Sequence, residues 1–396
     1  MEQETSMTDR RKSTSTRTLI AAKSFNRRTM LKATAAFGTA AAIGPWFVRD
    51  ALSQSGELSW FTWEDYAPKP LVDKFTKDTG IKLNVTLFSS NEEQLNKLRA
   101  ARGEGFDLCT PTITWVGAHV EAGNLQPFDE SKMPNLKNMI PSFYKKIDEL
   151  GGRVGGKLYC SPHDWGTEAL GFDTKAMDLK YGQASFGDLW DPKWKGKMTC
   201  RPRSIMLGTG LWMEAKGEIP PGSMFKAYTD QATMEKYYSQ TLDYAIKNKA
   251  QIGKFWQGTA DTHAAFLQEG CVIGQTWDGP INTMANENKP YKYLAPKEGA
   301  LTWVDSVSLT KGAKNIAQAY EFIKWIQTPE NGGLLADETG YNSVVTGAEK
   351  HTKPSYTKNF NNAYPGDALE KLWFQGEEKP WFIAKRQEYA TKVQAA

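Results

Sequence analysis

Histidine and cysteine are scarce in this chain of 396 residues, which limits the chemistry that it can perform. It has four of each, with no two histidines at the spacing of a metal motif and no Cys-x-x-Cys pair. A Gly-x-Ser-x-Gly nucleophile motif is also missing. We therefore expect no catalytic residues, no metal and no cofactor, so that the protein is not an enzyme.

The four cysteines, Cys109, Cys160, Cys200 and Cys271, each lie in a short apolar run that is typical of a strand. We expect them to be small buried core residues. One disulfide bridge remains an alternative, because an exported protein meets an oxidising environment.

Long hydrophobic segments are also absent. The longest apolar run, residues 33–48, spans about 16 residues, fewer than the roughly 20 that cross a bilayer. It follows the pair Arg27-Arg28 and ends near the small residues of Ala51-Leu52-Ser53. This pattern predicts that residues 1–53 are a twin-arginine signal peptide, and that the twin-arginine export machinery delivers the folded protein to the periplasm.

Excess charge of one sign is missing from the predicted mature chain. Residues 1–53 hold nine of the 49 basic and four of the 45 acidic side chains, which leaves 40 basic against 41 acidic. The chain therefore offers no basic surface for nucleic acid, and we expect no nucleic-acid partner.

Strand and helix patterns alternate after the leader. Expected strands cover residues 58–63, 81–87 and 106–111; one helix between them ends at Gly80, and the next begins at a Ser90–Glu93 capping box. Such alternation predicts an α/β fold with mostly parallel sheets flanked by helices. Ligands bind such sheets at the carboxyl ends of the strands. The residues at these ends are Trp63, Glu64, Ser89, Thr112 and Thr114.

A glycine-rich turn at residues 151–156 indicates a crossing to a second domain. It is followed by Lys157, as in a phosphate-binding loop, but Leu158 stands where that loop needs a hydroxyl, so we interpret it as a turn. Beyond it we expect strands at 158–162, 169–172, 197–200, 272–277 and 301–309, and helices at 234–248 and 316–327.

Aromatic residues are abundant, with 14 tryptophans. Three of them lie one or two residues from a carboxylate, in Trp63-Glu64-Asp65, Trp277-Asp278 and Trp303-Val304-Asp305. Aromatic faces attract ammonium groups by about 0.5–2 kcal/mol each. Core packing is the alternative for any single tryptophan, but the paired carboxylates favour a site for an amine.

Seven segments resemble the spermidine/putrescine-binding group of the periplasmic solute-binding proteins of ABC importers. They occur in the same order from Leu58 to the C-terminus: FTWEDYAP from Phe61, FTKDTGIK from Phe75, SSNEEQLNKL from Ser89, FDLCTPT from Phe106, LWDPKWKGK from Leu189, PKEGALTWVDSVSLT from Pro296 and ETGYNSV from Glu338.

The resemblance implies a two-lobed type II periplasmic binding protein fold that closes around its ligand by a hinge motion. We expect one lobe at residues 54–164 and 302–350, and the other at 165–301 and 351–396. It further implies a protein that captures a polyamine-type amine and delivers it to an inner-membrane ABC permease. The ligand contacts of the family fall on Trp63, Trp277, Trp303, Tyr341, Asp305 and Gln375.

The chain departs from this group at four positions. Arg201 and Ser204 stand where polyamine binders carry an Asp and a Glu, Thr114 replaces a Tyr, and Glu64 replaces a Thr. A cation facing a polyamine in a closed cleft would be strongly unfavourable.

Three alternatives therefore stay open for Arg201. It pairs with an acidic neighbour, or it binds an anionic group of a zwitterionic ligand such as an amino acid derivative, opine or aminophosphonate. Otherwise a cationic ligand rests mainly on acidic residues elsewhere in the cleft. The possible pairing partners are Asp164, Glu168 and Asp278, and the possible acidic seats are Glu64, Asp278 and Asp305. A hydrolase or transferase on the same scaffold is a weaker alternative.

Overall fold

The computed structural model describes residues 56–396, so the predicted signal peptide lies outside the described residues. In this part of the chain, strands and helices alternate as the sequence predicts. No helix within it is both long and apolar enough to cross a membrane.

Three parallel strands form one end of the main sheet: β1 (Glu57–Trp63), β2 (Lys82–Phe88) and β3 (Leu108–Cys109), with β1 in the middle. The first two match the expected strands, but the third is much shorter than the predicted 106–111. The backbone turns after Cys109 into the loop that carries Thr112, which reaches β11 through an isolated bridge to Asp305.

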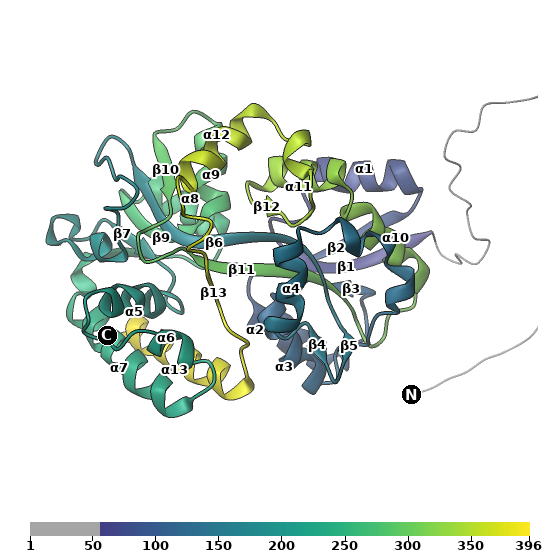
Figure 1. Ribbon diagram of the computed structural model, residues 1–396, viewed down its shortest axis with the longest axis horizontal. Helices are drawn as coiled ribbons and strands as arrows, with labels where there is room; N and C mark the ends of the chain where they lie inside the picture. Colours follow the sequence, from purple (N-terminus) through teal and green to yellow (C-terminus); the bar gives the residue numbers. More distant parts are fainter. Residues whose placement is uncertain (1–55) are drawn as a thin grey trace, which may run out of the picture. The chain divides into compact units, whose positions relative to one another are not determined.

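Two long antiparallel strands, β6 (Ser161–Asp173) and β11 (Leu301–Leu309), continue the sheet and run through its middle (Figure 1). The prediction placed two separate strands at 158–162 and 169–172, whereas the structure has one strand of 13 residues. All of its residues but the last are buried, so the polar residues from His163 to Glu168, which interrupt the apolar pattern, point into the molecule rather than forming a loop.

A second set of parallel strands forms the other end of the sheet. It comprises β9 (Ile273–Trp277), β7 (Met198–Cys200) and β8 (Ile252–Phe255), and β9 pairs antiparallel with β6. Three short strands pair with the two long ones: β10 (Tyr291–Leu294) and β12 (Asn342–Ser343) with β6, and β13 (Trp373–Phe374) with β11. The glycine-rich turn is a separate hairpin of β4 (Arg153–Val154) and β5 (Lys157–Leu158), with Gly155 and Gly156 at φ 57° and 75°.

Helices cover both faces of the sheet, in four groups (Figure 1). At the β1–β3 end, one group is α1 (Lys69–Thr79), α10 (Ile316–Ile326) and α11 (Pro329–Thr339), and the other is α2 (Asn91–Ala100), α3 (Val116–Glu121) and α4 (Pro141–Glu149). At the β7–β9 end, one group is α8 (Thr259–Leu267), α9 (Asp278–Asn286) and α12 (Pro354–Ala363), and the other is α5 (Ile205–Ala215), α6 (Ser223–Lys226), α7 (Gln231–Lys247) and α13 (Pro380–Ala395).

The start of α2 shows how the sequence fixes a boundary next to the cleft. Ser90 caps the helix by accepting a hydrogen bond from the Glu93 backbone N–H at 3.1 Å, as the predicted capping box requires. The reciprocal bond is shifted by one residue, because the Glu93 carboxylate accepts from the Ser89 backbone N–H at 2.9 Å. All four cysteines are buried and free, so the alternative of a disulfide is wrong.

Candidate functional site

A cleft of about 60 Å³ lies where the strands of both parallel sets end. One water molecule occupies roughly 10–15 Å³ by the same measure, so the cleft suits a small solute. Its lining combines aromatic, acidic and basic side chains: Trp63, Glu64, Asp65, Tyr66, Ser89, Asn91, Thr112, Glu168, Arg201, Arg203, Ser204, Trp277, Trp303, Asp305, Tyr341, Gln375, Glu378 and Arg386.

Asp305 lies on β11 and is almost fully buried. Its Oδ2 accepts a hydrogen bond from the Tyr66 hydroxyl at 2.7 Å, and its Oδ1 is enclosed without a partner. Burial raises the pKa of Asp305 to about 6, while the hydrogen bond from Tyr66 and the charge of Arg201 act to lower it. This free oxygen of Asp305 can accept a hydrogen bond from a ligand.

Asp164 is the direct neighbour of Asp305, because the two residues pair across β6 and β11. Burial and the adjacent Asp305 charge raise the pKa of Asp164 well above its ordinary value. Two carboxylates in one buried site resist ionising together.

Four aromatic rings surround this end of the cleft: Trp63, Trp277, Trp303 and Tyr341. Trp63 meets Trp277 edge to face at 6.2 Å between ring centres, and Trp303 meets Tyr341 in the same way at 5.1 Å. We call these four rings the aromatic box. Rings arranged in this way offer faces that attract a cation and pack on methylene groups.

Two glycines allow the rings to lie where they do. A Cβ at Gly166 would come within 2.2 Å of the Trp303 ring, and one at Gly279 within 2.5 Å of the Tyr341 ring. Any larger residue at either position would push a ring of the aromatic box out of place.

Glu64 and Asp65 follow β1 and contact the first turn of α8. The Thr259 backbone N–H donates to Glu64 at 3.3 Å, and its hydroxyl donates to Asp65 at 2.5 Å. Tyr341 donates a further hydrogen bond to Asp65 at 3.1 Å. Burial raises the pKa of both carboxyls. These contacts hold one edge of the cleft closed.

Two of the twelve predicted site residues, Thr114 and Asp278, do not line the cleft. Asp278 accepts hydrogen bonds from Thr167, Asn342 and Tyr364, which satisfy both of its oxygens within the fold. Burial still raises its pKa to about 7. Thr114 is buried behind the lining, and its backbone carbonyl accepts from the Glu378 N–H. The other ten predicted residues all line the cleft.

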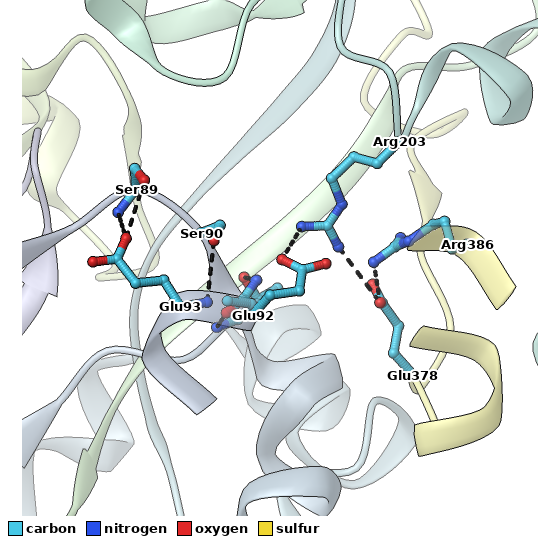
Figure 2. Close-up of polar contacts among 9 residues, drawn as sticks. Ser89, Ser90, Glu92, Glu93, Arg203, Glu378 and Arg386 are labelled. Carbon is cyan, nitrogen blue, oxygen red and sulfur yellow. Dashed lines mark hydrogen bonds and ion pairs between the residues drawn. The ribbon is translucent and has the colours of Figure 1, made fainter. Parts of the chain in front are cut away.

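The opposite end of the cleft holds a cluster of two arginines and two glutamates, shown in Figure 2. Arg203 contacts Glu92 on α2 at 2.8 Å and Glu378 at 3.7 Å, and Arg386 on α13 contacts Glu378 from the other side. Burial opposes the charge of Glu92, but Arg203, Arg386 and Arg201 keep its pKa below the ordinary value. We call these four residues the Arg–Glu cluster. Through the Arg203–Glu92 contact it ties the loop after β7 to α2.

Arg201 lies between the Arg–Glu cluster and the aromatic box. Its guanidinium carbon lies 4.8 Å from the ring centre of Trp277 and 5.4 Å from that of Trp256. It forms no ion pair with Asp164, Glu168 or Asp278, so the alternative of an acidic partner among these three is wrong. Glu168 instead accepts from the Ser204 hydroxyl at 2.5 Å and from Gln275 at 2.6 Å.

The sequence analysis did not name seven of the lining residues as ligand contacts, besides Ser89, which it placed at a strand end. One of the seven, Arg203, lies two residues after Arg201 in the loop that follows β7. Asp65 and Tyr66 directly follow β1, and Asn91 opens α2, so strand-end reasoning could have included them. Glu168 lies inside β6, which the prediction broke in two. Glu378 and Arg386 come from the C-terminal segment, where no local pattern marks them.

The family of the chain follows from a comparison with protein-family profiles. Residues 70–363 match the profile described as bacterial extracellular solute-binding protein. The chain belongs to this family. Its location is therefore the periplasm, as predicted, in agreement with the relatives below.

Two relatives from Escherichia coli illustrate the similarity. The spermidine/putrescine-binding periplasmic protein is 27% identical over 309 residues, which cover 78% of this chain and 83% of the relative. The putrescine-binding periplasmic protein PotF is 25% identical over 349 residues, which cover 85% and 91%. Among solved structures, the spermidine/putrescine ABC transporter substrate-binding protein PotD from Streptococcus pneumoniae superposes with a TM-score of 0.67 at 21% identity, covering 86% of this chain and 98% of that one. The fold is thus the predicted type II periplasmic binding protein fold.

The raised pKa of Asp305 leads to a prediction about pH. Affinity for a cationic amine should fall as the pH drops through 6, because protonation removes the charge that holds the ammonium group. The loss should approach about tenfold for each further pH unit. Calorimetry between pH 5 and 8 measures it, and the Asp305→Asn variant, which has no charge to lose, should show a much weaker dependence. Equal slopes for the two proteins would contradict the assignment.

Proposed function

We propose that this solute-binding protein is the substrate-binding component of an ABC importer and captures a small amine for delivery to an inner-membrane permease. The observation that carries the proposal is the free carboxylate oxygen of Asp305, enclosed in a cleft whose walls include the aromatic box. A carboxylate among aromatic faces stabilises an ammonium group by charge, hydrogen bonding and cation–π attraction together.

Polyamines are the leading substrate class, because the relatives are named as spermidine- and putrescine-binding proteins. The second class consists of zwitterionic or anionic solutes that carry an amine, such as amino acid derivatives, opines and aminophosphonates. Arg201 supports the second class, since it puts a positive charge where a polyamine would bring another. In both classes Asp305 binds the ammonium group of the solute.

Binding without covalent chemistry is part of the proposal. The family consists of solute-binding proteins, and the two buried histidines, His119 and His163, have pKa values lowered by burial to about 3, which suits core residues rather than proton carriers. A purified protein that turned over an amine, and lost that activity on changing one cleft residue, would favour the hydrolase or transferase alternative.

We also propose that the cleft closes by hinge motion between two lobes, one of residues 54–164 and 302–350 and the other of 165–301 and 351–396. The Glu64–Thr259 and Arg203–Glu92 contacts support this division, because each joins a residue of one proposed lobe to a residue of the other. Both contacts would break on opening.

A thermal-shift screen of the mature chain tests the proposed function. A ligand at a hundredfold excess over its Kd stabilises the folded state by about 2.7 kcal/mol, which raises the melting temperature measurably. The panel should include putrescine, spermidine, amino acids, opines, betaines and aminophosphonates. The proposal requires a clear shift with at least one amine, and no shift with any amine in the panel would contradict it.

Export by the twin-arginine machinery is a further proposal, and it predicts a specific defect. Replacing Arg27 and Arg28 with Lys should leave full-length precursor in the cytoplasm, because the machinery recognises the paired arginines. The pair Arg10 and Arg11, which the apolar run does not follow, is the matched control, and its replacement with Lys should not affect export. Immunoblots of periplasmic and cytoplasmic fractions measure the outcome. Normal periplasmic levels of the Arg27/Arg28 variant would refute the proposed route.

A further inference from the structure

Arg201 is a buried cation with two nitrogens, Nε and Nη2, that lack a hydrogen-bond acceptor. It follows β7 directly, it is only 6% exposed, and it lines the cleft. Its Nε and Nη2 are enclosed, yet neither forms a hydrogen bond, and its side chain forms no ion pair with any described residue. A buried charge of this kind is costly unless something in its surroundings accepts from it.

The other two arginines of the cleft do not share this property. Arg203 and Arg386 both contact Glu378, and Arg203 also contacts Glu92. Glu168 on β6, whose charge acts on Arg201, already accepts two hydrogen bonds, from Ser204 and Gln275. The carboxylates at this end of the cleft are therefore engaged by other donors, and Arg201 remains available.

The position of Arg201 is fixed by the rings beneath it. Its guanidinium lies over Trp277 and Trp256, and the Trp256 indole N–H donates to the Gln275 backbone carbonyl at 2.8 Å within the core. Contacts with aromatic faces leave the N–H groups of a guanidinium able to donate hydrogen bonds. The two rings therefore position Arg201 without using the donors at Nε and Nη2.

The polar atoms of the cleft lining that lack a hydrogen-bond partner indicate which polar groups a ligand must carry. The enclosed donors are Nε and Nη2 of Arg201 and the indole N–H groups of Trp63 and Trp303, and the enclosed acceptor is Oδ1 of Asp305. A polyamine carries only donors, so it could satisfy Asp305 but none of the four donors. A solute with an anionic group as well as an ammonium group matches both sets.

We propose that the solute carries a carboxylate or phosphonate which Arg201 binds through two of its nitrogens, while the ammonium group of the same solute is held by Asp305 and the aromatic box. This inference rests on the proposed function and specifies its ligand as a small zwitterionic amine. Planar, bidentate pairing with an oxyanion is the contact for which the guanidinium is best suited.

The test uses probes matched in length. Putrescine and 4-aminobutyrate share a four-carbon chain with an amine at one end and differ only at the other, while 3-aminopropylphosphonate replaces the carboxylate by a phosphonate. Calorimetry should give the wild-type protein a higher affinity for one of the two anionic probes than for putrescine. The preferred anionic probe then identifies the group that Arg201 binds.

Variants of Arg201 assign the contact. Arg201→Ala should weaken binding of the preferred anionic probe by about 10- to 150-fold, the range expected for a lost charge-assisted contact, and leave putrescine affinity unchanged or improved. Arg201→Lys keeps the positive charge but lacks the paired N–H donors of a guanidinium. Its affinity for the anionic probe should therefore lie between those of the Arg201→Ala variant and the wild type. Arg99→Ala, at an exposed position on α2, is the control and should bind as the wild type does.

The outcomes separate this inference from the proposed function. Putrescine binding more tightly than both anionic probes, with no loss on Arg201→Ala, would overturn the inference and leave the proposed function standing. A failure of every amine in the wider panel to bind would overturn both. A loss on Arg201→Ala that is equal for putrescine and the anionic probe would also overturn the inference, because it would indicate a structural role for Arg201.

Discussion

Replacing Asp305 with Asn is expected to weaken binding of the amine by about 10- to 150-fold, which corresponds to roughly 1.5–3 kcal/mol for a lost charge-assisted hydrogen bond. Asn preserves the shape of the side chain and can still accept from Tyr66, which donates to Oδ2 at 2.7 Å. The substitution therefore removes the charge without opening a cavity. Calorimetry with the ligand selected by the thermal-shift screen measures the change.

Two controls make this result specific to the cleft. Asp73→Asn makes the same chemical change at an exposed position on α1, where the carboxylate pairs only with Lys69, and should leave affinity unchanged. The ligand-free Asp305→Asn protein should be at least as stable as the wild type, because the lost carboxylate is one whose charged form is disfavoured by burial. An unaltered affinity in a well-folded Asp305→Asn protein would remove Asp305 from the site.

The second large effect concerns stability. Glu378→Gln should lower the free energy of unfolding by about 3–5 kcal/mol, because it leaves Arg386 and Arg203 with one carboxylate fewer in a buried setting. Glu378 is 3% exposed and Arg386 is 4% exposed, so water cannot replace the lost charge. Urea denaturation of the ligand-free protein, followed by circular dichroism, measures the change.

The matched control lies on α13, the helix that carries Arg386. Glu388 pairs with Lys392 and Lys385 on the solvent side of α13, where exposure screens the charges. Glu388→Gln should therefore leave the unfolding midpoint unchanged. If Glu378→Gln were no more destabilising than Glu388→Gln, the Arg–Glu cluster would not be the tie between α13 and the cleft that the contacts indicate.

The fold was predictable where apolar periodicity and turn signals agree. The strand at 301–309 and the helix that ends at Gly80 have the expected bounds, because their patterns are regular and their ends are marked. Strand β6 was not predictable as one element, because polar residues between His163 and Glu168 interrupt its apolar pattern although all of them are buried. One of these residues, Glu168, lines the cleft.

The site was predictable to the extent that its residues flank strand ends or carry the family resemblance. Ten of the twelve predicted residues line the cleft, but the role of each in binding stays a prediction. Asp278 was misplaced because an indole–carboxylate neighbour pair says nothing about which donors reach the carboxylate, and here Tyr364 and Asn342 do. Glu378 and Arg386 required the three-dimensional structure: α13, which carries Arg386, packs against α7, and the Glu378 backbone N–H donates to the Thr114 carbonyl.

A crystal structure of the mature protein with the amine selected by the screen tests the central claim most directly. The account predicts one ligand in the cleft, with its ammonium nitrogen within hydrogen-bonding distance of Asp305 Oδ1 and its carbon chain against the aromatic box. A ligand bound elsewhere on the molecule, or bound in the cleft with its nitrogen away from Asp305, would contradict the account.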